Sequence, residues 1–251
     1  MTSAYQNLNV IILTDKHALG VKAAADAAVT IKTLLNKKEH INIIFAAAPS
    51  QSVFLESLKN DISIVWERVN AFHMDEYLGL PANAPQSFGN FLADAIFGHV
   101  NFRSVNYING NTADTDKERE RYASLLNDNK PDIVFMGIGE NTHLAFNEPF
   151  QANFNDPEII KKVTLDAVCR RQQVNDGCFE RLEDVPVKAL TLTIPVLLGA
   201  DYIFCMVPGI NKAEAVVKTL KEPISVKYPS TILREHQNAK LYLDSQSASL
   251  L

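Results

Sequence analysis

The segment Ile133–Gly139 (IVFMGIG) carries the pattern that decides the fold of this chain. Four apolar residues run directly into two glycines, which is typical of a buried strand that ends in a tight turn. The same kind of strand recurs at Ile41–Phe45 (INIIF), where it leads into a loop of small residues and then into a helix near Val53–Leu58. The chain is therefore built from repeated strand–loop–helix units.

Other segments extend this alternation along the chain. Strands are predicted at Leu8–Leu13, Val69–Phe72, Leu190–Ile194 and Tyr202–Val207, with an edge strand at Lys240–Leu243, and helices at Ala18–Leu35, Phe88–Phe97 and Ala213–Leu220. The alternation predicts a Rossmann-like α/β fold, a mainly parallel sheet with helices on both faces. A chain of 251 residues suits one such domain over residues 1–251. Ligands of these sheets bind at the carboxyl ends of the strands.

Composition excludes several classes of protein. Hydrophobic residues make up 47% and charged residues 21%, which is ordinary for a globular protein. The formal net charge of -5 gives no footprint for general nucleic-acid binding, although an anionic small molecule can still bind in a local basic pocket. No run is long enough for a transmembrane helix, and the N-terminus lacks the basic lead-in and cleavage site of a signal peptide. We expect a cytoplasmic protein.

Cysteine and histidine spacing indicates no metal site. Cys169, Cys178 and Cys205 form no CxxC pair, and their odd number argues against a disulfide framework. His143 and Glu148 lack the HExxH pattern of a zinc-binding helix.

Titratable side chains cluster after two of the predicted strands. His73, Asp75 and Glu76 follow Val69–Phe72, where a buried carboxylate could take a proton from a carbon beside a carbonyl or imine. His143 and Glu148 follow the glycines after Ile133–Met136, and a carboxylate could fix the tautomer of the imidazole. A solvated acidic loop in the first case, and a core histidine beside a loop glutamate in the second, are the plain structural alternatives.

Two basic segments could bind an anion. Lys212 stands at the start of a predicted helix after Pro208–Gly209, where its charge opposes the helix dipole unless an anion binds there too. Arg170 and Arg171 are adjacent and could clamp a phosphate, which is a weaker signal. A lysine that points to water explains the first segment equally well.

Together these segments resemble the glucosamine-6-phosphate deaminase (isomerase) family. MDEYLGL at Met74–Leu80 and HLAFNEP at His143–Pro149 are similar to two family signatures, in the family's order, and PGINKAEAV at Pro208–Val216 also matches. The related 6-phosphogluconolactonases look similar around the glycine-rich loop, but differ where this chain has Phe146–Glu148. The resemblance covers nearly the whole chain.

The resemblance implies a role for each matching residue. Asp75 corresponds to the base that moves a proton between C2 and C1 of the open-chain sugar. His143 corresponds to the residue that opens the pyranose ring, Glu148 to its carboxylate partner, and Asn141 stands where many members have Asp and others Asn. Lys212 corresponds to a phosphate-binding lysine. The implied reaction converts glucosamine 6-phosphate to fructose 6-phosphate and ammonia, without a metal or organic cofactor.

The chain departs from the family pattern at three places. The family's Thr-Gly-Gly-Thr-like phosphate loop is replaced by Ala47–Ser52, in which Ser50, Gln51 and Ser52, together with the turn at Gly137, are predicted to bind substrate or phosphate. Thr142 replaces the usual glycine before the histidine, so this turn is either ordinary or strained. The family's phosphate-binding arginine has no secure counterpart, and Arg170 is preferred over Arg171 because it follows the strand-like run Val163–Val168 more directly.

These departures leave other functions open. The alternatives are an isomerase for another hexosamine 6-phosphate such as galactosamine 6-phosphate, a 6-phosphogluconolactonase, and a non-catalytic sugar-phosphate sensor. The sensor is disfavoured because both acid/base motifs are present and no helix-turn-helix fits before Leu8. The expected partner is a phosphorylated amino sugar, with no nucleic acid and no membrane, and a homo-oligomer is left open.

Overall fold

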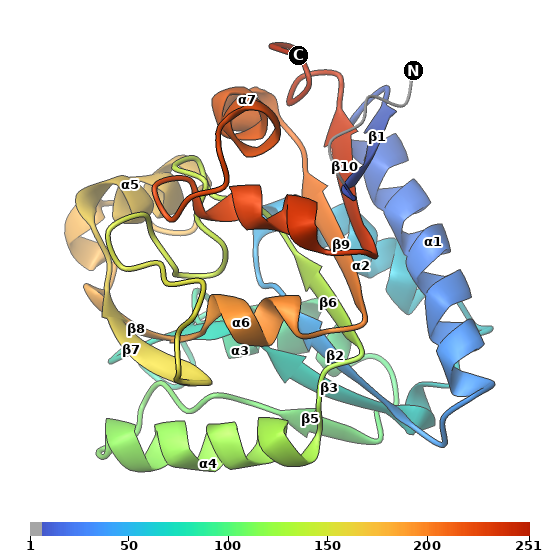
Figure 1. Ribbon diagram of the computed structural model, residues 1–251. Coiled ribbons are helices and arrows are strands. Elements are labelled where there is room, and N and C mark those ends of the chain that lie inside the picture. Colours follow the sequence, from blue (N-terminus) through green and yellow to red (C-terminus); the bar gives the residue numbers. More distant parts are fainter. Residues whose placement is uncertain (1–6) are drawn as a thin grey trace.

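In the computed structural model, which describes residues 7–251, seven parallel strands form the central sheet (Figure 1). Residues 1–6 lie outside the described part of the chain. They belong to the domain predicted over residues 1–251 and to the N-terminal segment that is not expected to be a signal peptide. From edge to edge, the strands are β1 (Asn9–Leu13), β10 (Ala239–Asp244), β9 (Tyr202–Val207), β6 (Ile133–Met136), β2 (Ile41–Phe45), β3 (Val69–His73) and β5 (Ser104–Asn106).

The order of the strands reverses between β2 and β6, which lie side by side. From β2 the chain adds β3 and β5 on one side, whereas from β6 it adds β9 and β10 toward the other side. The loops that leave the two central strands therefore diverge, and this opens a crevice at their carboxyl ends.

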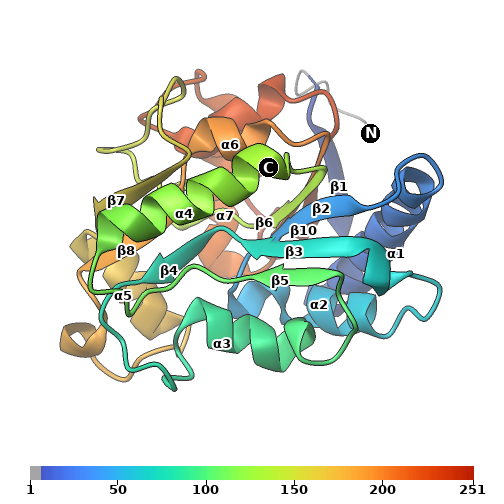
Figure 2. The ribbon, with the colours of Figure 1, turned by 90° about the horizontal axis from the view of Figure 1, so that it is seen from below.

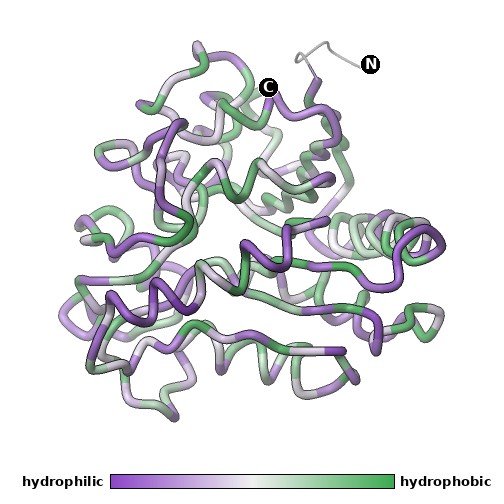
Figure 3. The backbone as a smooth tube through the Cα atoms, turned by 60° about the horizontal axis from the view of Figure 1, so that its bottom comes forward, coloured by the Kyte–Doolittle hydropathy of each residue, from purple (hydrophilic) through white to green (hydrophobic). Residues whose placement is uncertain are grey.

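Helices cover both faces of this sheet (Figure 2). One face packs against α1 (Lys16–Leu35), α2 (Ser52–Lys59) and α3 (Phe88–Leu92), and the other against α4 (Thr115–Asp128), α6 (Ile194–Leu198) and α7 (Ala213–Lys221). Because side chains alternate along a strand, Ile43 and Phe45 join the first core and Ile44 joins the second. Hydrophilic residues gather in the peripheral turns (Figure 3).

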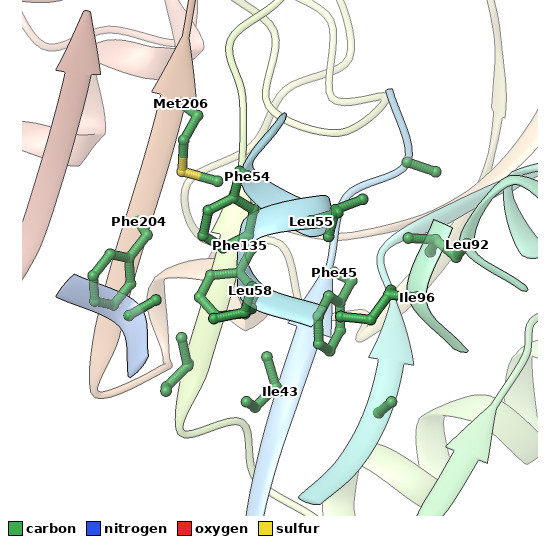
Figure 4. Close-up of a cluster of buried hydrophobic side chains, with 14 of the residues drawn as sticks. Ile43, Phe45, Phe54, Leu55, Leu58, Leu92, Ile96, Phe135, Phe204 and Met206 are labelled. Atoms are coloured by element: carbon green, nitrogen blue, oxygen red, sulfur yellow. The ribbon is translucent and has the colours of Figure 1, made fainter. Parts of the chain in front are cut away.

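The core on the first face fixes β2, β6 and α2 relative to one another (Figure 4). The ring centroid of Phe135 lies 5.2 Å from that of Phe45 and 4.8 Å from that of Phe54, both in edge-to-face geometry. Such pairs add about 0.5–1.5 kcal/mol each beyond the area that they bury. The loop between β2 and α2 is thus held at both ends by packed aromatic residues.

A second, antiparallel sheet lies beside the first. It contains β4 (Asp75–Tyr77), β8 (Lys188–Leu192) and β7 (Ile160–Thr164), and α5 (Ala167–Asn175) follows β7. Only Met74 separates β3 from β4, so the chain passes directly from one sheet to the other at Asp75. Asp75 is held there by its pairing with Thr191 of β8.

The predicted α/β fold is confirmed, with two corrections. Lys240–Leu243 is not at an edge: β10 lies between β1 and β9, its Leu241, Tyr242 and Leu243 are fully buried, and β1 is the edge strand. The strand-like run Val163–Val168 ends at Thr164, since Asp166 caps α5. In residues 7–251, no helix combines the length and the apolar character needed to cross a bilayer.

Candidate active site

A cavity of about 440 Å³ opens at the carboxyl ends of the central strands. The loops after β2, β3, β6, β9 and β10 line it, together with Lys16 of α1 and the C-terminal part of α5. It therefore lies at the reversal of strand order between β2 and β6, where the fold leaves space for a ligand.

Asp75 lines this cavity from the junction of the two sheets. Its side chain is almost completely buried, and burial, with a smaller effect of the Glu76 carboxylate, raises its pKa well above the ordinary value. A carboxylate in this environment is a stronger base than an exposed aspartate. The side chain is thus suited to take a proton from a ligand in the cavity.

The other two titratable residues of this segment have structural roles. Glu76 points to the opposite side of β4, where its carboxylate accepts hydrogen bonds from the amides of Phe88 (3.0 Å) and Gly89 (2.8 Å) at the start of α3. His73 is fully buried and its Nε2 accepts from the Ile108 amide at 2.8 Å. Neither lines the cavity, so Asp75 alone remains from this cluster.

The glycines after β6 let the backbone turn beneath His143. A Cβ atom at Gly139 would lie only 2.1–2.3 Å from three atoms of the His143 ring, so no other residue fits there without moving the imidazole. A Cβ atom at Gly137 would lie 3.3 Å from its nearest neighbours, Gln51 Nε2 and Met206 O. Gly139 therefore positions the histidine. Gly137 lets the loop after β2 and the end of β9 approach the loop after β6 closely.

Asn141 links His143 to Glu148. His143 Nδ1 lies 2.8 Å from Asn141 Oδ1, and Asn141 Nδ2 donates to Glu148 Oε2 at 3.2 Å. Because the amide nitrogen of Asn141 is directed to the carboxyl group of Glu148, the amide oxygen of Asn141 must accept from His143 Nδ1. This leaves a lone pair on His143 Nε2. The predicted pair of His143 and Glu148 is therefore a chain of three residues, in which the glutamate acts through the asparagine.

Burial sets the protonation of both ends of this chain. Burial, together with the positive charge of Lys212, lowers the pKa of His143 to about 3, so the imidazole is neutral. Burial, with the nearby carboxyl group of Asp166, raises the pKa of Glu148 to about 7. A neutral imidazole with a free Nε2 at a cavity wall can accept a proton from a ligand hydroxyl.

Thr142 takes the strained conformation of the two that its sequence left open. Its φ is 73°, in the left-handed region, and its buried hydroxyl has no hydrogen-bond partner among the described residues. A β-branched residue pays about 1–2 kcal/mol for this backbone conformation. The strain is located directly before His143, where the carbonyl of Thr142 also accepts from the Ser230 amide at 2.9 Å.

Lys212 lines the same cavity from the segment after β9. Gly209 turns the chain with a φ of 98°, and its amide donates to both carboxylate oxygens of Asp244 at 3.1 Å. Lys212 is 8% exposed, and its ammonium makes no hydrogen bond or ion pair with residues 7–251. Burial lowers its pKa, while Asp176 and Glu140 oppose that shift. The ammonium of Lys212 thus lines the cavity without a protein partner among these residues, so it is free to bind an anion there.

The loop after β2 contributes two of its three predicted residues. Ser50 and Gln51 line the cavity, and Gln51 Nε2 lies 3.2 Å from Ser50 Oγ, while its buried Oε1 has no partner among the described residues. Ser52 is exposed at the start of α2 and is not part of the lining. The predicted phosphate role of Ser52 is therefore corrected.

The structure places Arg170 outside the cavity, which corrects its predicted phosphate contact. Its guanidinium donates to the carbonyls of Val185 (3.1 Å) and Leu182 (2.5 Å), and Arg171 does not line the cavity either. The cause is that the carbonyls of Leu182 and Val185 hold the guanidinium in the segment that follows α5. Gln172 and Gln173 occupy the wall instead.

Several lining residues escaped the sequence analysis. Lys16 reaches the rim from the start of α1, with its Nζ 3.3 Å from the carbonyl of Pro49. Gln172, Gln173, Asp176 and Asp244 belong to elements that are far apart in sequence. Lys16 alone left a signal, since a lysine in the first turn of a helix opposes the dipole as Lys212 does.

Fold and cavity together define a Rossmann-like α/β protein with an acid/base site at the reversal of strand order. A family model described as glucosamine-6-phosphate isomerases/6-phosphogluconolactonase matches residues 14–243. A glucosamine-6-phosphate deaminase of Listeria monocytogenes serovar 1/2a is 31% identical over 241 residues, which are 96% of this chain and 99% of that protein. One of Bacillus cereus strain B4264 is 33% identical over 221 residues, 88% and 82% of the two chains.

Solved structures agree with this assignment. The structure of a monomeric glucosamine-6-phosphate deaminase superposes with a TM-score of 0.87 at 29% identity, and covers 97% of this chain and 100% of that one. The 6-phosphogluconolactonase of Thermotoga maritima, at 17% identity and a TM-score of 0.78, shows the shared fold alone. The chain belongs to the family of glucosamine-6-phosphate isomerases and 6-phosphogluconolactonases, as the resemblance of MDEYLGL and HLAFNEP predicted.

Proposed function

We propose that this protein isomerises and deaminates glucosamine 6-phosphate, with water, to fructose 6-phosphate and ammonia. One observation carries the proposal: a single cavity brings together the carboxylate of Asp75, the neutral imidazole of His143 and the buried ammonium of Lys212. Relatives that share about a third of the sequence over most of its length are named for this reaction.

Two of these groups, His143 and Asp75, each have a step in this reaction. His143 Nε2 accepts the proton of the C1 hydroxyl and returns it to the ring oxygen, which opens the pyranose to the aldehyde. Asp75 then takes the proton from C2 and delivers it to C1 through an enolamine, which leaves an imine at C2. Water adds to that carbon and the amine departs as ammonia. These steps are proton transfers, addition of water and loss of ammonia, with no external oxidant or reductant, so no metal or organic cofactor is required by the scheme.

Lys212 is proposed to bind the phosphate, with Ser50 and Gln51 as neighbouring donors. A charge-assisted hydrogen bond contributes about 1.5–3 kcal/mol, and the ammonium has no competing partner among the described residues. Lys16 supplies a second cation at the rim of the same cavity, where the predicted arginine is absent. Assembly into a homo-oligomer stays a prediction.

The test is ammonia release across a panel of substrates. Glucosamine 6-phosphate should give ammonia and fructose 6-phosphate in equal amounts, and EDTA should not change the rate. Galactosamine 6-phosphate, unphosphorylated glucosamine and 6-phosphogluconolactone form the other arms. Hydrolysis of the lactone without ammonia from any hexosamine 6-phosphate would overturn the proposal.

A further inference from the structure

One residue of β8, Thr191, is attached to both of the segments that carry acid/base groups. Its backbone is paired with that of Asp75 in the antiparallel sheet, and the amide of the next residue, Leu192, donates to the carbonyl of Met74 at 2.8 Å. The Thr191 hydroxyl donates to the Leu192 carbonyl at 3.2 Å, and its oxygen accepts from the amide of Phe146 at 3.1 Å. A fully buried threonine thus joins the strand of the aspartate to the loop of the histidine.

The attachment falls on a tight turn directly after His143. In this turn, Leu144–Asn147, the backbone amide of Asn147 donates to the carbonyl of Leu144 at 3.0 Å, and the side chain of Asn147 donates to the same carbonyl at 2.9 Å. The Asn147 side chain also donates to the carbonyl of Leu192 at 2.8 Å. A second hydrogen bond therefore ties the turn to β8, one residue after the first.

The turn depends on its surroundings for its shape and direction. Ala145 has a φ of 51°, in the left-handed region, and a residue with a side chain stays there only where the surrounding structure holds it. The ring of Phe146 packs against those of Tyr77 (5.5 Å between centroids) and Phe88 (5.6 Å). Such apolar contacts have little directional preference, whereas a hydrogen bond weakens steeply as its angle changes. The hydrogen bonds to β8 therefore set the orientation of the turn.

We infer that Thr191 is a positioning residue, whose hydroxyl sets the place of His143 relative to Asp75. Thr191 does not line the cavity, so it acts on a ligand only through the turn that it holds. The inference rests on the proposed function, in which ring opening and proton transfer from C2 act on the same bound sugar. The two groups must then stand in fixed geometry, and a displacement of about 1 Å can cost about 10²-fold in rate.

Other contacts of the histidine loop lead away from β4. The amide of Gly139 donates to the carbonyl of His143 at 3.0 Å, and the carbonyl of Thr142 accepts from the amide of Ser230 at 2.9 Å. These contacts fix the loop to itself and to the segment after α7. By contrast, β8 is hydrogen-bonded to the loop and paired with β4 at the same residue, Thr191.

The test removes the hydroxyl by Thr191→Val, which keeps the β-branched shape of the side chain and leaves the Phe146 amide without its acceptor. With glucosamine 6-phosphate, kcat should fall by about ten- to a hundredfold. Because the Lys212 wall is untouched, kcat/KM should fall by the same factor. Thr191→Ser keeps the hydroxyl and should restore kcat. Thr193→Val is the matched control, since this buried hydroxyl donates to the carbonyl of Glu158 at 2.6 Å and not to the histidine loop; it should leave kcat unchanged.

A second measurement needs no substrate. In protein labelled with ¹⁵N in the histidine rings, with His143→Gln to assign the signal, the His143 ring resonances should shift in Thr191→Val and stay in place in Thr193→Val. A folded Thr191→Val with wild-type kcat, or with unshifted His143 resonances, would overturn the inference, whatever its loss in thermal midpoint. Thr191→Ala replaces the valine variant if that one does not fold. If wild type releases no ammonia, the proposed function fails, while the ring resonances still decide the role of Thr191.

Discussion

In the loop after β6, the functional side chains are hydrogen-bonded to one another, whereas in the loops after β2 and β9 the polar groups are turned to the cavity. His143, Asn141 and Glu148 form a continuous chain. By contrast, the ammonium of Lys212 lines the cavity and makes no ion pair among residues 7–251. The comparison teaches that the acid/base half of the site, the loop after β6, is completed by the fold alone. The anion half, the loops after β2 and β9, is completed by its ligand. Substitutions should therefore affect the two halves in different ways.

The largest effect should come from Gly139→Ala, which strikes the acid/base half without removing any polar group. The added methyl group would occupy the position of the His143 ring, so the imidazole must move. Loss of a positioned general base typically costs about 10²–10⁴-fold in rate. Ammonia release from glucosamine 6-phosphate measures it. Gly137→Ala is the matched control, since its methyl group would require its neighbours to shift by only a few tenths of an ångström; equal losses in both variants would contradict the role of Gly139.

Lys212→Ala should instead weaken binding and should do so only for phosphorylated ligands. Removing one charge-assisted hydrogen bond of about 1.5–3 kcal/mol lowers affinity by about one to two powers of ten. Calorimetric titration with a phosphorylated and an unphosphorylated hexosamine gives the two affinities. If both fell equally, Lys212 would be a structural residue of the wall and the anion half would be wrongly assigned.

The sequence predicted the acid/base half better than the anion half, and the reason is physical. Asp75, His143 and Glu148 lie in short continuous segments that follow strands, so their convergence can be expected from the strand order of an α/β sheet. The anion half depends on which face of a helix points inward. Arg170 and Gln172 are two positions apart, and only the structure shows that α5 directs the glutamine and not the arginine to the cavity.

The second sheet and the interior place of β10 were also beyond the sequence. A pattern of apolar residues gives the existence of a strand but not its neighbours, and Lys240 at the start of β10 is compatible with an edge as well as with an interior position. Asn141 was recognised through its position in the motif, yet its place between His143 and Glu148 required coordinates.

A smaller effect should appear in the pH dependence of stability. The pKa of Glu148 is about 7 in the folded protein, against an ordinary value of 4.5, so the folded state binds this proton more tightly. Its favourable contribution is complete below the ordinary value and is lost as the pH rises through about 7. Glu148→Gln should therefore gain in thermal midpoint relative to wild type between about pH 5 and pH 8. Exposed Glu120→Gln is the control, and a difference that stays flat with pH would contradict the buried proton.

The smallest effect concerns the strain in the acid/base half. Thr142→Gly should raise the free energy of unfolding by about 1 kcal/mol, because glycine adopts a φ of 73° freely and removes an unpaired buried hydroxyl. Chemical denaturation measures the change. A loss of stability would mean that the threonine side chain is packed better than its backbone is strained, and Ala145, at a φ of 51°, would then be the next position to examine.

Solvent deuterium exchange by Asp75→Asn tests the central claim. The claim is that Asp75 acts as a base on a sugar phosphate that Lys212 holds in the same cavity. Wild type in D₂O with glucosamine 6-phosphate should incorporate deuterium at the sugar carbons that exchange their proton, as mass spectrometry and NMR can follow. Asp75→Asn should lose this incorporation by about 10²–10⁴-fold while it still binds the substrate, because the base is gone and the Lys212 wall is intact. Incorporation by Asp75→Asn at the wild-type rate would contradict the account.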